Sequence, residues 1–233
     1  MTPPGNTRAL APGAVQNPAA AVCLLSFACT IIRETFFTWT PVYLRVHLGY
    51  SMSLAADILA LYQARGTQAY FGEPVSTAEH GLQAAHFARA EAAPEALVVA
   101  ALLHDIGHLL EDAPDAIEEW TLDTRREEIG ARWLARYFDA AVCEPVRLHV
   151  RAKRYLCATD AGYLARLSTA SVHTLKLQGS PMSASEVTHF ESQPFWREAV
   201  RLRRWDDQGK VAGLKTLALL DYAPLIERVA AGG

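Results

Sequence analysis

Apolar residues recur at helical spacing through most of the chain after residue 52. Between residues 53 and 65 they lie three or four positions apart, at Leu54, Ile58, Leu61 and Tyr62, as on one face of a helix. Similar spacing predicts helices over residues 76–92, 94–112, 124–138, 145–156, 168–177, 183–190, 195–206 and the end of 213–230. Because no alternating strand pattern and no internal repeat occurs, we predict an all-α fold, a compact helical bundle.

Local signals mark where some of these helices begin. Ser76-Thr-Ala-Glu79 and Ser183-Ala-Ser-Glu186 are capping-box patterns, in which a serine and a glutamate bond N–H groups at the start of a helix. The first pattern puts His80 in the opening turn of its helix. The loop Tyr70-Phe-Gly-Glu-Pro-Val75 precedes it, and Gln178-Gly-Ser-Pro181 predicts a turn.

Residues 1–51 differ from the rest, and we interpret them as an irregular N-terminal extension to a domain of residues 52–233. Up to Pro18 they are rich in Pro, Gly, Ala and Asn, which predicts disorder. The apolar run from Ala19 to Ile32 is shorter than the roughly 20 residues of a membrane helix, and no clear signal-peptide cleavage site follows it. An alternative hypothesis starts the native protein at Met52, which N-terminal sequencing would test.

Composition narrows the classes of function. The chain has 233 residues, 51% hydrophobic and 20% charged, with a net charge of -3, so we expect one sizeable domain and no surface for nucleic acid. We expect no membrane partner either. The four cysteines form no C-x-x-C pair, and we interpret them as reduced thiols in a cytoplasmic protein.

The strongest chemical signal is a His-Asp doublet inside an apolar stretch. His104 and Asp105 follow Ala100-Ala-Leu-Leu103, and His108 comes one turn later. Burying such side chains costs several kcal/mol unless they are paired or bind a metal. A satisfied pair of core histidines is the alternative, but the doublet together with the following Gly-His favours a metal.

Other predicted helices supply further candidate ligands. His80 follows the first capping box, His149 lies one turn before Lys153, and Asp206 follows an aromatic, basic segment. Imidazole and carboxylate ligands without thiolates suit Fe, Mn, Zn or Co. Because the carboxylate of a His-Asp doublet can bridge two metals while the imidazole holds one, the pattern favours a dinuclear centre. Alone, His80 and the His149–Lys153 pair are more typical of structural or surface residues.

His80, His104-Asp105 and Asp206 together resemble the H…HD…D pattern of the HD-domain superfamily, whose members are mostly metal-dependent phosphohydrolases. A longer set of segments is similar to one branch, the phosphonate-cleaving HD-domain oxygenases. Those enzymes act on 2-amino-1-hydroxyethylphosphonate or its trimethylammonio analogue. The resemblance covers roughly residues 52–214 and is carried by Tyr70–Glu73, Glu79–Gln83, Ala101–His108, His149–Leu156, Leu167–Ser171, Gln178–Met182 and Arg203–Asp206.

The resemblance implies a mixed-valent diiron centre bridged by Asp105. His80, His104 and Asp206 would hold the first iron, and His149 would help to hold the second. The substrate partners would be a small organophosphonate and O2, and the products phosphate and a carboxylate, glycine or betaine.

The same resemblance implies roles for the residues around the metals. Lys153, Ser171 and Arg203 would bind the phosphonate, since charge-assisted hydrogen bonds are the strong ones. Glu73 would receive the substrate ammonium, and His108 would line the substrate pocket. Tyr70 would cover the first iron until substrate arrives. Whether the substrate nitrogen is a primary or a quaternary ammonium is left open.

One position departs from the family pattern. A further histidine ligand of the second metal is expected in a His-Glu-x-x-Gly context, but this chain has Arg126-Glu-Glu-Ile-Gly130. A guanidinium stays protonated and cannot bind a cation. The second site could then be weak or empty, Glu127 or Glu128 could replace the imidazole, or Arg126 could turn away and leave a water ligand.

The sequence is compatible with three functions. An oxygenase that cleaves a C–P bond accounts for Tyr70 and Glu73, which a metal-dependent phosphohydrolase acting on a phosphate ester leaves unexplained. Arg126 favours a third possibility, a non-catalytic or weakened relative that keeps the anion pocket.

Overall fold

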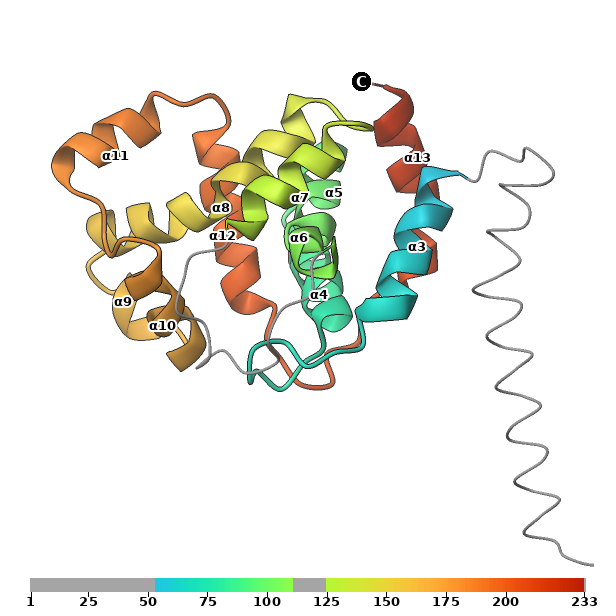
Figure 1. Cartoon of the computed structure of the whole chain (residues 1–233), viewed down its shortest axis with the longest axis horizontal. Helices are drawn as coiled ribbons and strands as arrows, with labels where there is room; N and C mark the ends of the chain where they lie inside the picture. The colour runs from blue at the N-terminus through green and yellow to red at the C-terminus, as the bar shows by residue number, and fades with distance from the viewer. Residues whose placement is uncertain (1–52, 111–124, 233) are drawn as a thin grey trace, which may run out of the picture. The chain divides into compact units, whose positions relative to one another are not determined.

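A computed structural model describes residues 53–110 and 125–232 and confirms the all-α fold, since these residues form helices and no named strand. Figure 1 shows their arrangement. The elements in chain order are α3 (Leu54–Arg65), α4 (Thr77–Ala90), α5 (Glu95–Leu103), α6 (Ile106–Leu110), α7 (Arg126–Leu134), α8 (Ala140–Thr159), α9 (Tyr163–Arg166), α10 (Thr169–Leu177), α11 (Ala184–Glu191), α12 (Trp196–Gln208), the 3-10 helix η3 (Leu219–Tyr222) and α13 (Ala223–Ala231).

Helix α5 lies at the centre of the hydrophobic core. Every residue from Leu97 to Leu103 is buried, and a helix that is apolar on all sides must be covered on all sides. Helices α4, α8, α12 and α13 contact it. His104 and Asp105, which directly follow α5, therefore lie in the interior of the protein.

The helix predicted over residues 94–112 is wrong as one continuous element. Helix α5 ends at Leu103, α6 begins at Ile106, and His104 and Asp105 lie in the break between them. The apolar pattern runs on through the break and hides it. In this break the side chains of His104 and Asp105 lie near groups from α4, α8 and α12.

Other boundaries also differ from the pattern. Helix α8 begins at Ala140, before the predicted start at Pro145, because Asp139 caps it by accepting from the N–H of Ala141. Pro145 lacks a backbone donor and its ring crowds the carbonyl of Ala141, a cost that the capped 20-residue helix outweighs. Helix α7 is shorter than predicted, and α9 and η3 were not predicted. Both capping boxes are confirmed.

Gly107 allows the closest approach between α6 and α7. A Cβ on this residue would run into the carbonyl oxygen of Arg126 and would lie 3.2 Å from the backbone nitrogen of Gly130. Both obstacles are backbone atoms, which cannot rotate away. Gly107 therefore fixes where the backbone of Arg126 lies relative to residue 108.

We expect Gly107→Ala to lower the free energy of unfolding by about 2 kcal/mol or more, because the added methyl group overpacks a backbone contact. This corresponds to a Tm lower by roughly 4–8 °C for a domain of this size, measured by thermal unfolding. Gly232→Ala is the control, since its nearest atom would lie at an ordinary 3.5 Å. Equal Tm values for both variants would contradict the close approach.

Some sequence predictions lie outside the described residues. They are the extension over residues 1–51 with its alternative start at Met52, and the connection between residues 111 and 124. The boundary of the domain stays a prediction. In the described part of the chain, no helix combines the length and apolarity of a membrane span, and Cys143 and Cys157 are free thiols.

Candidate metal centre and adjoining pocket

Five buried polar residues converge from four parts of the fold. His80 comes from the first turn of α4, His104 and Asp105 from the break after α5, His149 from α8 and Asp206 from α12. None of the five is more than 7% exposed. Buried groups of this kind are retained only when they are paired or hold an ion, so their meeting needs a chemical explanation.

Two imidazoles face each other with their acceptor nitrogens. The Nδ1 atom of His80 lies 2.8 Å from the carbonyl oxygen of Gly209. The Nδ1 atom of His104 lies 2.9 Å from the carbonyl oxygen of Ala101. A carbonyl oxygen only accepts, so each Nδ1 carries the hydrogen and each neutral ring turns a lone pair on Nε2 inward. The two Nε2 atoms are 3.1 Å apart. Two lone pairs at this separation require a cation between them, either a proton or a metal.

Carboxylates complete this first cluster. The Oδ1 atom of Asp206 lies 3.4 Å from Nε2 of His80, and Oδ2 of Asp105 lies 3.4 Å from Nε2 of His104. One ligand atom from each of His80, His104 and Asp206 falls within 4.8 Å of the others. Asp206 Oδ1 is buried without a hydrogen-bond partner among the described groups. The residues fit a metal ion, because nitrogen and oxygen donors bonded to one metal at about 2.1 Å lie roughly 3–4 Å apart.

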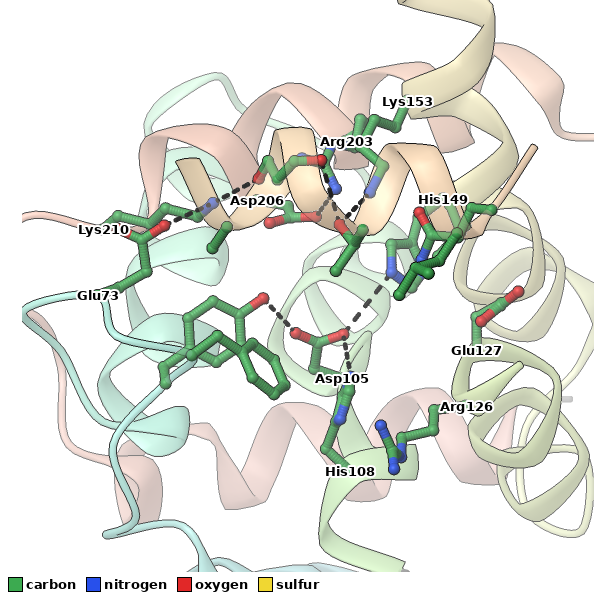
Figure 2. Close-up of a pocket in the computed structure, with 18 residues that line it drawn as sticks. Glu73, Asp105, His108, Arg126, Glu127, His149, Lys153, Arg203, Asp206 and Lys210 are labelled. Atoms are coloured by element: carbon green, nitrogen blue, oxygen red, sulfur yellow. Dashed lines mark hydrogen bonds and ion pairs between the residues drawn. The ribbon is translucent and has the colours of Figure 1, made fainter. Parts of the chain in front are cut away.

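Asp105 faces a second set of nitrogens with its other oxygen. Its Oδ1 atom lies 3.7 Å from Nε2 of His149 and 3.8 Å from Nε2 of His108. Figure 2 shows these two contacts on one side of the carboxylate. The Nδ1 atom of His149 lies 2.7 Å from the carbonyl oxygen of Val146, which turns its Nε2 lone pair toward Asp105. The two oxygens of Asp105 therefore face two different groups of side chains, Oδ2 toward His80 and His104 and Oδ1 toward His108 and His149.

The charges of this centre depend on one another. The neighbouring histidines overcome burial and hold the pKa of Asp105 well below its usual range, and Arg203 does the same for the pKa of Asp206. Burial lowers the pKa of His104, but Asp105 and Asp206 outweigh it and raise that pKa to about 9. Burial lowers the pKa of His149 to about 4. The two ionised carboxylates attract a cation, which is either the proton that the raised pKa keeps on His104 or a metal ion.

A pocket opens beside the centre and is lined by residues from both groups. Its volume is about 70 Å³, and Tyr70, Glu73, Asp105, His108, Arg126, His149, Lys153, Ser171, Thr174, Arg203, Asp206 and Lys210 are among the residues that line it. The Tyr70 ring stacks on His80 with a centroid distance of 3.9 Å. Its hydroxyl donates to Oδ2 of Asp105 at 2.7 Å. Tyr70 therefore covers the His80 ring and holds Asp105 at the edge of the pocket.

Lys153 gives the pocket a buried positive group. Its Nζ atom donates to Oγ1 of Thr174 at 2.8 Å, and the residue is only 3% exposed. Burial, aided by Arg203, lowers the pKa of Lys153 to about 7. A buried ammonium with a hydroxyl beside it suits an anion with several acceptor oxygens.

Arg203 and Ser171 line the pocket but also have structural contacts. The Arg203 guanidinium donates to Oδ2 of Asp206 at 2.6 Å, to the Tyr163 hydroxyl at 3.1 Å and to Asp207. It thereby orients the Asp206 carboxylate. The Ser171 hydroxyl accepts from the Nζ atom of Lys210 at 3.0 Å.

The sequence prediction missed Lys210 and Thr174. Lys210 Nζ lies 3.4 Å from Oε1 of Glu73, and this pair is largely buried. A lysine just after α12 carries no local signal for such a contact, because Glu73 lies in a loop far away in the sequence. Glu73 therefore faces a cation of the protein at the position where a substrate ammonium was expected.

Arg126 is buried and lies beside His108 (Figure 2). Burial lowers the pKa of His108 to about 4, and the positive charge of Arg126 acts in the same direction. Glu127 lines the pocket. Glu128 instead lies 3.9 Å from Arg125, through side chains that are 44% and 69% exposed, so it is engaged outside the buried centre.

Comparisons with known proteins agree with the sequence resemblance. Residues 73–186 match the family model described as HD domain. The chain is 44% identical over 169 residues to "[1-hydroxy-2-(trimethylamino)ethyl]phosphonate dioxygenase (glycine-betaine-forming)" of Leisingera caerulea, covering 72% of this chain and 86% of that protein. It is 46% identical over 172 residues to "Hydroxymethylphosphonate dioxygenase" of Gimesia maris, covering 73% and 85%. An uncharacterised protein of Acanthamoeba polyphaga mimivirus is 38% identical over 201 residues, covering 85% and 91%.

Proposed function

Because the chain belongs to the HD-domain family of phosphonate dioxygenases, we propose that it is an iron-dependent oxygenase that cleaves the C–P bond of a 1-hydroxyalkylphosphonate. The observation that carries the proposal is Asp105. Its carboxylate has one oxygen toward His80 and His104 and the other toward His149, beside a pocket that contains the buried Lys153. That arrangement fits two metals and an anionic substrate.

The overall reaction balances without an external reductant. A 1-hydroxyalkylphosphonate dianion and O2 give a carboxylate, hydrogen phosphate and one proton. The C–P and C1–H bonds break, and C1 loses four electrons, all of which O2 accepts. The activation of O2 is the chemistry that iron supplies when it is bound.

The protein's own residues bind and shield the substrate. Lys153, with Thr174 and Ser171 beside it, is proposed to hold the phosphonate oxygens through charge-assisted hydrogen bonds. Arg203 keeps Asp206 ionised and oriented. Burial and Asp105 raise the pKa of Tyr70 well above its usual value, so its phenol keeps its proton. Tyr70 is proposed to cover the first metal until substrate binds.

The experiment measures phosphate release with and without O2. The protein is purified from iron-supplemented cells and given hydroxymethylphosphonate, 2-amino-1-hydroxyethylphosphonate and the trimethylammonio analogue. Phosphate release that requires O2 is expected for at least one of them. Phosphate release from simple phosphate esters in the absence of O2 would instead support a phosphohydrolase. Binding of these phosphonates without release would support a non-catalytic relative.

Lys210 is expected to influence the enzyme's preference between substrates with and without a cationic substituent. Its ammonium lies against Glu73, so a cationic substrate must displace it before reaching that carboxylate. We expect Lys210→Met to raise the ratio of kcat/KM for 2-amino-1-hydroxyethylphosphonate over hydroxymethylphosphonate by roughly fivefold, which corresponds to an ion pair of about 1 kcal/mol. The ratio cancels changes in phosphonate binding that both substrates share.

The exposed Lys215 provides the matched control. Lys215→Met should leave the substrate ratio unchanged. If Lys210→Met also leaves the ratio unchanged, Glu73 does not meet the substituent on C1.

A further inference from the structure

The second metal position lacks an imidazole at residue 126, and we propose that His108 supplies it in this chain. The inference rests on the proposed function, because it concerns the same centre. It changes the role of His108 from a residue that lines the substrate pocket to a ligand of the second iron. The second site would then consist of Asp105 Oδ1, His149 Nε2 and His108 Nε2.

The distances around Asp105 carry this inference. His149 and His108 lie at nearly equal distances, 3.7 and 3.8 Å, from the same carboxylate oxygen, measured from their Nε2 atoms. Donor atoms that share a metal at bond lengths near 2.1 Å lie roughly 3–4 Å apart. The first cluster has the same spacing, with 3.4 Å between His104 Nε2 and Asp105 Oδ2. His108, like His149, is thus directed at the Asp105 oxygen that does not face His80 and His104.

The backbone explains how residue 108 can serve in place of residue 126. Gly107, the neighbour of His108, lies directly against the carbonyl group of Arg126. Positions 108 and 126 therefore send side chains into the centre from adjoining points on α6 and α7, as Figure 2 shows. An imidazole lost from one helix can be replaced by an imidazole from the other without moving either helix.

Competing ligands fit less well. The Arg126 guanidinium is a permanent cation and cannot bind a metal. Glu128 pairs with Arg125 through largely exposed side chains. Glu127 lines the pocket, but its carboxylate points away from Asp105 in Figure 2. His108 has an Nε2 atom already directed at the bridging carboxylate.

A double-mutant cycle on iron content tests the inference. Iron per chain and the Mössbauer spectrum are measured for the full chain, His108→Ala, Arg126→His and the double variant. We expect about two irons per chain in the unaltered protein and in Arg126→His, and about one in His108→Ala. The double variant should recover about two, since the imidazole at residue 126 makes His108 dispensable. The Mössbauer signal of the second iron should disappear only in His108→Ala.

His189→Ala is the control for a histidine outside the centre, because His189 is exposed on α11. If His108→Ala is insoluble, His108→Gln takes its place and is judged against the same cycle. Two irons in the His108 single variant would overturn the inference, as would a single iron in the unaltered protein. Loss of the second iron on Glu127→Gln, with His108→Ala unaffected, would assign the role to Glu127.

Iron content and spectra are recorded without substrate, so they separate this inference from the proposed function. Two irons that depend on His108, with no phosphate released from any phosphonate, would support the ligand and contradict the oxygenase. Phosphate release with iron content independent of His108 would support the oxygenase and contradict His108 as a ligand.

Discussion

Asp105→Asn is expected to release iron from both positions and to lower turnover by ~10⁴-fold or more, as removal of a residue central to a catalytic unit does. Asparagine has nearly the same shape, but its amide carries no charge and only one of its two terminal atoms can bind a metal. The aspartate oxygens face His104 on one side and His149 on the other. The substitution therefore removes the negative charge that both positions would share and leaves one of them without its oxygen donor.

Iron per chain and O2-dependent phosphate release are the measurements for Asp105→Asn. Asp139→Asn is the matched control, because Asp139 is an exposed N-cap of α8 and asparagine caps a helix equally well. Two irons and near-normal turnover in Asp105→Asn would rule out a bridging carboxylate at the centre. Circular dichroism of both variants checks that the helices remain.

Lys153→Gln is expected to lower kcat/KM by roughly 10–100-fold, mainly through KM, because a hydrogen bond to a charged group contributes about 1.5–3 kcal/mol. The Lys153 ammonium is buried beside Thr174 and the pocket, so solvent screens its charge little. Lys176→Gln on the exposed side of α10 is the control. A similar loss in both variants would show that Lys153 has no particular role in binding the anion.

The pH dependence gives a second measure of Lys153. Burial lowers the pKa of Lys153 to about 7. Only the protonated form attracts the phosphonate, so kcat/KM should fall as pH rises through about 7. Lys153→Arg should lose this decline, because a guanidinium stays charged throughout. Superimposable pH profiles for lysine and arginine would assign the decline to another group.

The sequence by itself predicted most of the helices and the polar residues that converge in the buried cluster. Helical spacing and two capping boxes are encoded within a few residues of each other, so they can be recognised locally. The His104-Asp105 doublet stands out because buried charge is costly. The family resemblance, confirmed by the comparisons, then named the chemistry. The roles of individual site residues stay predictions.

Only the tertiary structure decided how these residues face one another. The break between α5 and α6 is invisible in a continuous apolar pattern, yet it lets Asp105 present one oxygen to each group of histidines. The contact between Glu73 and Lys210, and the approach of Gly107 to Arg126, join segments far apart in the chain. Such contacts depend on how helices pack, and packing is set by the whole core rather than by neighbouring residues. That is why Arg126 marked a missing ligand in the sequence, while His108 became its candidate replacement only in three dimensions.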